Sequence, residues 1–88
     1  MYLHLGQDTV VKTADIIGIF DMDTSTVSKP TRDFLRISEK NNNVINVSFE
    51  LPKSFVVCKK KGKKATVYIT QLSSTTLENR SKTFLGYK

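Results

Sequence analysis

Between Ser54 and Leu72 the sequence reads SFVVCKKKGKKATVYITQL. Two runs rich in β-branched and aromatic residues, Ser54–Lys60 and Ala65–Leu72, flank a lysine block with Gly62 at its centre. Strand-forming runs on both sides of a short, glycine-containing turn are typical of a β-hairpin. The sequence therefore predicts a hairpin whose tip carries five lysines: Lys59, Lys60, Lys61, Lys63 and Lys64.

The first strand of this hairpin is apolar on both faces. Phe55 and Val57 alternate with Val56 and Cys58, and successive side chains of a strand point to opposite faces of a sheet. Strands of this kind are buried on both sides. Two short helices cover one face of a small sheet, so we expect a second chain to cover the other. The pattern favours a homo-oligomer, and a tightly wrapped monomer is the alternative.

The N-terminal part of the chain predicts a second hairpin and a further strand. Met1–Leu5 alternates in polarity, Gly6–Thr9 is a turn, and Val10–Lys12 resumes an extended path. The run Ile16–Phe20 is β-branched and aromatic, which favours a buried strand with its first and last side chains on one face.

A helix is predicted over Arg32–Lys40. Pro30, two residues after Ser28, is a helix-start signal, because proline is preorganised for the first helical turn. The side chains of Phe34, Leu35 and Ile37 are expected to point inward. The residues before this helix, 21–29, are polar and typical of a turn.

A second helix is predicted near the C-terminus, because Thr75 with Glu78 three residues later fits a capping box. This helix should run through Lys82 and end near Gly86, and Val44–Leu51 should be extended. Together the elements predict a single α+β domain over residues 1–88. The domain should contain a small, mainly antiparallel β-sheet and one or two short helices.

The net charge of +6 is unevenly distributed. Residues 1–44 carry five basic and six acidic side chains, which is a net charge of −1, whereas residues 45–88 carry nine basic and two acidic ones, a net charge of +7. Such asymmetry is typical of proteins that meet a nucleic acid, an acidic membrane surface or an acidic partner. The chain has no apolar run of membrane-spanning length, no signal-peptide pattern and a single cysteine. A cytoplasmic location is expected.

Residues that carry out chemistry are scarce. His4 is the one histidine and Cys58 the one cysteine, so no metal-ligand cluster is predicted. A mid-strand cysteine is usually a small core residue, although a thiol enzyme that uses Cys58 with His4 stays open as a third, weaker alternative. We expect no enzyme activity, no catalytic residue, no cofactor, no metal and no small-molecule substrate.

Two blocks of the sequence carry a family resemblance. MYLHLGQDTVVKTADIIGIFD (Met1–Asp21) resembles the opening of the bacterial extracellular matrix regulators RemA and RemB, and in particular of the RemB branch. LPKSFVV (Leu51–Val57), the strand at 65–70 and QLSSTTLENR (Gln71–Arg80) follow in an order similar to that of the same family. The resemblance implies closed rings that bind DNA as transcriptional regulators of biofilm matrix genes. RemA-type members carry arginines before the strand that matches Phe55–Cys58, where this chain has Lys53.

The lysine block admits two interpretations. Charge at a hairpin tip protects a sheet from edge-to-edge aggregation. However, no acidic residue lies between Glu50 and Glu78, and a ring would repeat the block around a rim, which favours contact with DNA phosphates. The sequence thus predicts a ring-forming, nucleoid-associated regulator that contacts the backbone of double-stranded DNA. The alternative is a structural or protein-interaction homologue that has lost DNA binding. The predicted contact residues are Lys53, Lys59, Lys60, Lys61, Lys63 and Lys64.

Overall fold

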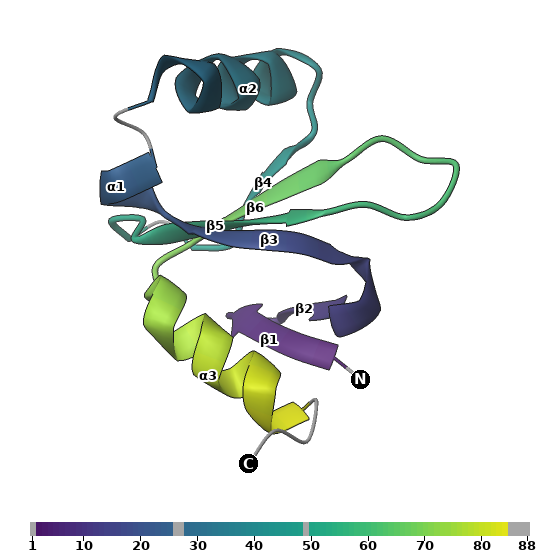
Figure 1. The fold of residues 1–88 in the computed structure, drawn as a ribbon, viewed down its shortest axis with the longest axis vertical. Coiled ribbons are helices and arrows are strands. Elements are labelled where there is room, and N and C mark those ends of the chain that lie inside the picture. The colour runs from purple at the N-terminus through teal and green to yellow at the C-terminus, as the bar shows by residue number, and fades with distance from the viewer. Residues whose placement is uncertain (1, 26–27, 49, 85–88) are drawn as a thin grey trace.

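The computed structural model describes residues 2–25, 28–48 and 50–84 (Figure 1). The elements follow one another in this order: β1 (Tyr2–Gly6), β2 (Thr9–Lys12), a 3-10 turn (Thr13–Asp15), β3 (Ile16–Asp21), α1 (Met22–Ser25), α2 (Lys29–Lys40), β4 (Val44–Asn46), β5 (Ser54–Cys58), β6 (Thr66–Thr70) and α3 (Ser74–Phe84). This is the α+β class that the sequence predicts. The predicted N-terminal hairpin is also confirmed, since β1 and β2 pair antiparallel.

The predicted lysine-tipped hairpin lies at the centre of a four-stranded sheet. β5 pairs antiparallel with β6, from Ser54 opposite Thr70 to Cys58 opposite Thr66. β3 pairs antiparallel with the other side of β5, and β4 pairs parallel with β6, so the strand order is β3-β5-β6-β4. β1 and β2 form a separate two-stranded sheet. The described strands are therefore mainly antiparallel, as predicted.

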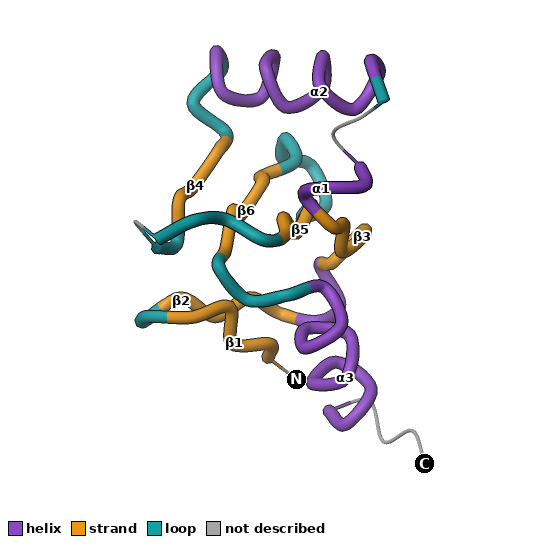
Figure 2. Tube along the Cα trace, turned by 90° about the vertical axis from the view of Figure 1, so that its left-hand side faces the viewer, coloured by secondary structure: helices purple, strands orange, loops and turns teal. Residues whose placement is uncertain are grey.

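The four-stranded sheet is the middle of three layers (Figures 1 and 2). α1 and α2 lie over one face, whereas the β1–β2 hairpin and α3 lie over the other. Two apolar clusters separate the layers. The helix-side cluster contains Phe55, Val57 and Val67, with Leu35 of α2 packed against them. The hairpin-side cluster contains Leu3, Leu5, Val11, Val47, Val56, Cys58 and Leu77.

This arrangement corrects the expectation that one face of the sheet stays uncovered within a single chain. All five residues of β5 are buried, because the N-terminal hairpin covers the face that the long helix α2 does not. Large apolar side chains are exposed at the periphery instead. The largest exposed fractions are 81 % for Leu51, 61 % for Ile17 and 56 % for Ile37. The strand at 16–20 is accordingly a partly exposed edge strand and not the buried strand that its composition predicts.

A β-bulge in β3 changes which of its side chains share a face. The pairing register shifts between Ile16 and Gly18. As a result Ile16 and Ile19 both pack against the hairpin-side cluster, whereas the ring of Phe20 stacks on that of Phe55 with centroids 5.1 Å apart. The prediction that Ile16 and Phe20 lie on one face is therefore wrong. A Cβ atom at Gly18 would lie 2.6 Å from the Phe20 ring, so glycine leaves room for that stack.

Helix α2 begins three residues before the predicted start, at Lys29. Ser28 is the N-cap, and Pro30 lies in the first turn, as the helix-start signal indicates. Leu35 packs against the helix-side cluster, whereas Phe34 is 39 % exposed and Ile37 is 56 % exposed, so of these three the prediction of an inward side chain holds for Leu35 alone.

Helix α3 is capped two residues earlier than predicted. The backbone N–H of Thr76 donates to Oγ of Ser73 over 3.2 Å, and the N–H of Leu77 donates to the carbonyl of Ser73 over 3.1 Å. Ser73 therefore occupies the capping position that the sequence pattern assigned to Thr75. Gly86, the predicted end of the helix, lies outside the described residues.

The middle of the chain departs most from expectation. Within the predicted polar turn, Met22–Ser25 forms a short helix, α1, which packs against β3 and β5. Within the extended run predicted over Val44–Leu51, the strand β4 comprises the first three residues, and the N–H of the next residue, Val47, donates to the carbonyl of Ile69 over 2.9 Å. These differences arise because neighbouring segments, and not local composition, decide how such short stretches fold.

Candidate functional site

The lysines of the β5–β6 hairpin form an exposed arm at one side of the molecule (Figure 1). We call residues 59–64 the lysine loop, and each of them is exposed. The N–H of Lys63 donates to the carbonyl of Lys60 over 3.0 Å, which closes a turn with Gly62 at φ 79° in its third position. A positive φ at this position is the pattern of a type II turn and favours glycine. The tight turn therefore presents the lysines in a small volume.

A backbone hydrogen bond fixes the base of the lysine loop. The N–H of Lys59 donates to the carbonyl of Asp15 over 2.9 Å, so the loop leaves the sheet beside the 3-10 turn. Cys58, the residue before it, pairs with Ile16 of β3. Because Asp15 and Ile16 belong to the 3-10 turn and to β3, the packed part of the fold sets the direction of the arm.

Lys53 lies away from the lysine loop. It precedes β5, where its N–H donates to Thr70 and its carbonyl accepts from the N–H of Met22, each over 2.9 Å. The five residues of β5 separate it from Lys59, so the two lysines are about 20 Å apart along the extended chain. The structure therefore brings together five of the six predicted contact lysines and places the sixth at the opposite end of the strand.

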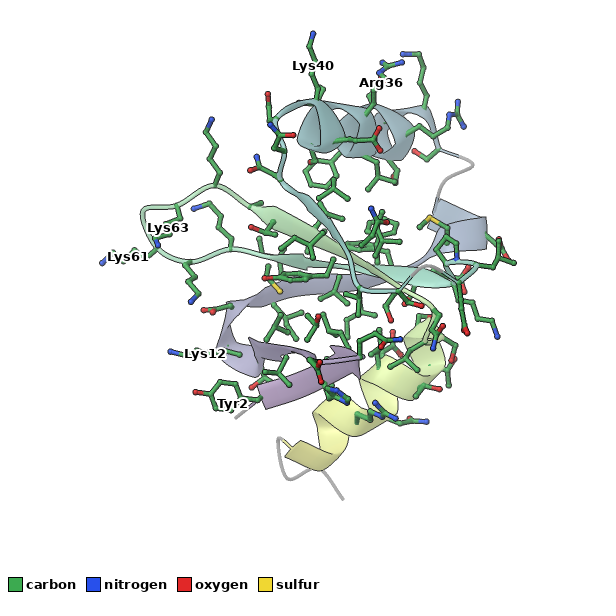
Figure 3. All side chains as sticks on the ribbon, turned by 180° about the vertical axis from the view of Figure 1, so that it is seen from behind. Tyr2, Lys12, Arg36, Lys40, Lys61 and Lys63 are labelled. Carbon is green, nitrogen blue, oxygen red and sulfur yellow. The ribbon has the colours of Figure 1, made fainter. Side chains whose placement is uncertain are left out.

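Lys12 is a basic residue near the lysine loop that the sequence reasoning missed. It ends β2 and points to the same side of the molecule as Lys61 and Lys63 (Figure 3). Lys12 and Lys60 line one cavity of about 170 Å³. The remaining residues that line it are Tyr2, Val10, Val11, Asp15 and Tyr68. A single lysine after two valines carries no motif, and only the packing of the N-terminal hairpin under the sheet reveals this neighbourhood.

Helix α2 carries a second group of basic side chains, and two of them are paired with an acid. Asp33 accepts from Nζ of Lys29 over 2.9 Å and from an Nη of Arg36 over 2.7 Å. Lys40 lies in the last turn and, like Arg36, projects away from the sheet (Figure 3). Among the residues that the structure describes, Lys40 makes no ion pair. Lys40 is therefore more available to an external anion than Lys29 and Arg36 are.

An apolar hollow lies between β3, β5 and the start of α2. Its volume is about 220 Å³, and its walls are mostly apolar. It is lined by Phe20, Pro30, Thr31, Phe34 and Phe55. Exposed aromatic side chains around a concave apolar site are typical of protein contacts.

Cys58 and His4 lie apart in the fold. Cys58 is buried in the hairpin-side cluster with Leu3 and Leu5, whereas His4 lies on the opposite, exposed face of β1. Burial, with a smaller contribution from the Asp15 carboxylate, raises the pKa of the Cys58 thiol to about 11. Burial, with smaller contributions from Cys58 and then from Asp15, raises the pKa of Tyr68. The structure thus does not assemble the pair that a thiol enzyme would need.

Within residues 2–25, 28–48 and 50–84, no three potential metal-ligating side chains gather at one point. In the same described part of the chain, no helix has the length and apolar character needed to cross a lipid bilayer.

Comparison with known proteins identifies the family. Residues 2–80 match the family model described as RemA-like, extracellular matrix regulatory protein A-like. The chain is also similar to extracellular matrix regulatory protein B of Bacillus subtilis (strain 168), with 40 % identity over 82 residues. That alignment covers 93 % of this chain and 91 % of the relative. The match extends across both hairpins and the layers that support the lysine loop, and the chain belongs to the RemA-like family of extracellular matrix regulatory proteins.

Proposed function

We propose that this chain is a non-enzymatic regulator of transcription that binds the phosphate backbone of double-stranded DNA through its lysine loop. One observation carries the proposal: five lysines lie in six consecutive exposed residues at the tip of a hairpin. No acidic residue lies in the 27 positions between Glu50 and Glu78 to neutralise them within the sequence. Lysine contacts to phosphate supply affinity and register, and they carry no sequence information directly.

The protein is proposed to act as a closed homo-oligomeric ring in the cytoplasm, on nucleoid DNA. The exposed apolar side chains of Ile17, Ile37 and Leu51 support self-association, because a chain of this size buries a limited share of its surface alone. A ring would place one lysine loop per subunit along the DNA, and linked contacts of this kind raise affinity without any new type of contact.

A titration of duplex DNA at several salt concentrations tests this function, on protein whose mass in solution has been measured. We expect an oligomer at micromolar concentration and an affinity that falls steeply with salt, because each neutralised phosphate contributes roughly 0.9 to the slope of log affinity against log salt. Replacing Lys59, Lys61, Lys63 and Lys64 with glutamine should reduce this slope by about three to four per contacting subunit.

A protein-interaction role is the second candidate, and the apolar hollow at Phe20, Pro30 and Phe34 favours it. A parent protein that shows no salt-dependent DNA binding would exclude the first candidate and leave the second. A species of 10 kDa alone would exclude the ring, because that is the mass of one chain. An unchanged slope in the glutamine variant would reduce the lysine loop to a solubilising tip.

A further inference from the structure

The shape of the lysine-loop arm matches a groove of duplex DNA. The last ladder pair of the hairpin is Cys58 with Thr66, and the seven residues between them extend past the sheet (Figure 1). About two and a half residues on each side of the turn correspond to about 8 Å of reach at the extended rise per residue. The major groove of B-DNA is about 8.5 Å deep and about 12 Å wide, and it admits a two-stranded β-ribbon. The minor groove of undistorted B-DNA is about 6 Å wide, and proteins that enter it commonly kink the duplex, so the straight duplex favours the major groove for this arm.

A cation lies on one side of the arm, in the N-terminal hairpin layer. Lys12 is exposed, and it lines the same cavity as Lys60 at the base of the loop. Asp15 lines that cavity too, yet among the described residues no ion pair involves Lys12. In Figure 3 Lys12 points outward, below the loop and toward the same side.

A second cation lies on the other side of the arm, in the helical layer. The N–H of Val67 in β6 donates to the carbonyl of Asn43 over 2.8 Å, which holds the segment after α2 beside the base of the hairpin. Lys40, the last residue of α2, is exposed and lies just before this segment. In Figure 3 Lys40 lies higher than the arm, at the end of α2 over the sheet, and Lys12 lies lower than the arm. The arm is thus flanked by one available lysine from each outer layer.

We propose that the β5–β6 arm enters the major groove, while Lys12 and Lys40 contact phosphates of the two strands that border it. Stacked sheets lie about 10 Å apart and a helix is about 10–12 Å across, so the two outer layers that carry Lys12 and Lys40 are separated by about 20 Å across the sheet. That span is comparable with a groove about 12 Å wide plus the sugar-phosphate backbone on each side. The flexible four-carbon side chain of lysine can adjust to the difference between the separation of the two layers and the distance between the two DNA backbones. This inference rests on the proposed DNA binding and adds to it the groove and two contact residues.

Uncharged groups placed in one groove or the other test which groove is entered. The full-length protein is titrated with three duplexes of one sequence: unmodified, carrying glucosylated hydroxymethylcytosine in the major groove, and carrying an alkyl group on guanine N2 in the minor groove. All three have the same phosphate charge. We expect the glucosylated duplex to bind about tenfold or more weakly, because the arm loses its lysine contacts, and the N2-alkylated duplex to bind within about twofold of the unmodified one.

Single variants test the flanking contacts. Lys12→Gln and Lys40→Gln should each lower the salt slope by about one per contacting subunit. Lys29→Gln is the matched control, because Lys29 is already paired with Asp33, and it should leave the slope nearly unchanged.

The outcomes separate this inference from the proposed function. If the parent binds no duplex, both fall. If it binds with a steep salt slope but tolerates the glucosyl groups, groove entry is wrong and backbone binding stands. If the glucosyl groups block binding while both lysine variants keep the parent slope, the arm enters the groove and the flanking contacts are wrong.

Discussion

The molecule has two basic regions, the lysine loop and helix α2. The hairpin that carries the loop and the helix pack on the same apolar cluster, but in the described structure only the helix has an acidic residue that pairs with its cations. Leu35 of α2 packs on the same helix-side cluster as Phe55, Val57 and Val67 of the hairpin. In α2 one carboxylate, Asp33, contacts both Lys29 and Arg36. The lysine loop has no acidic residue within its sequence neighbourhood. The comparison teaches that a count of basic residues overstates a binding surface, because the charge that an external anion meets is what remains after local pairing.

Weakening the shared support should give the largest effect. Val67 is fully buried in the helix-side cluster. Val67→Ala removes two methyl groups from a packed site and should lower the free energy of unfolding by about 2–3 kcal/mol. Urea unfolding at a fixed protein concentration measures this loss. Val10→Ala is the control, because Val10 is 54 % exposed and should cost little. Equal decreases in the free energy of unfolding in the two variants would show that the helix-side cluster does not stabilise the fold more than the exposed Val10 does.

Removing the acid of α2 tests whether pairing is what distinguishes the two regions. Asp33→Asn releases Lys29 and Arg36, so the salt slope of DNA binding should rise by up to about one per contacting subunit. The exposed pairs each contribute about 0.3–0.5 kcal/mol to the helix, so the fold should survive. Glu78→Gln on α3 makes the same change in net charge without an ion pair in the described structure and should raise the slope less. If the two variants raise the salt slope equally, the position of α2, and not pairing with Asp33, explains why its basic residues contribute little to DNA binding.

The smallest effect is expected at Cys58, the last residue of the strand that carries the lysine loop. Its pKa is raised to about 11 in the folded protein, above that of an ordinary thiol near 8.5. The folded state therefore binds more protons than the unfolded state between these values, so this group's contribution to stability is complete below about pH 8.5 and is lost as the pH rises toward 11. Cys58→Val should flatten that part of the stability profile, as measured by urea unfolding at several pH values.

Thiol labelling gives an independent test of the same residue. A buried, protonated thiol should react slowly with a thiol reagent at neutral pH. Rapid labelling in the folded protein, or a Cys58→Val variant with the parent's alkaline loss of stability, would contradict the burial described above.

The sequence predicts well those parts of the fold that depend on local pattern. Alternation along Tyr2–Gly6 and the turn chemistry of Gly62 were sufficient to predict both hairpins. Two features depend on contacts between distant segments, so composition did not indicate them. They are the bulge near Ile16 and the packing of the N-terminal hairpin over β5. The same limit applies to the candidate site. A run of lysines is visible in the sequence, whereas the proximity of Lys12 follows only from stacking of the layers.

One pair of double variants separates the lysine loop from the paired cations of α2 as contacts to DNA. Lys61→Gln with Lys63→Gln, and Lys29→Gln with Arg36→Gln, each remove two positive charges, the first pair from the lysine loop and the second from the paired face of α2. Binding to one duplex is measured for both variants and the parent across the same salt concentrations. We expect the loop variant to lower the slope of log affinity against log salt by about two per contacting subunit, and the helix variant to lower it by less than about half a unit. Equal decreases in the two variants, or no decrease in the loop variant, would contradict this expectation.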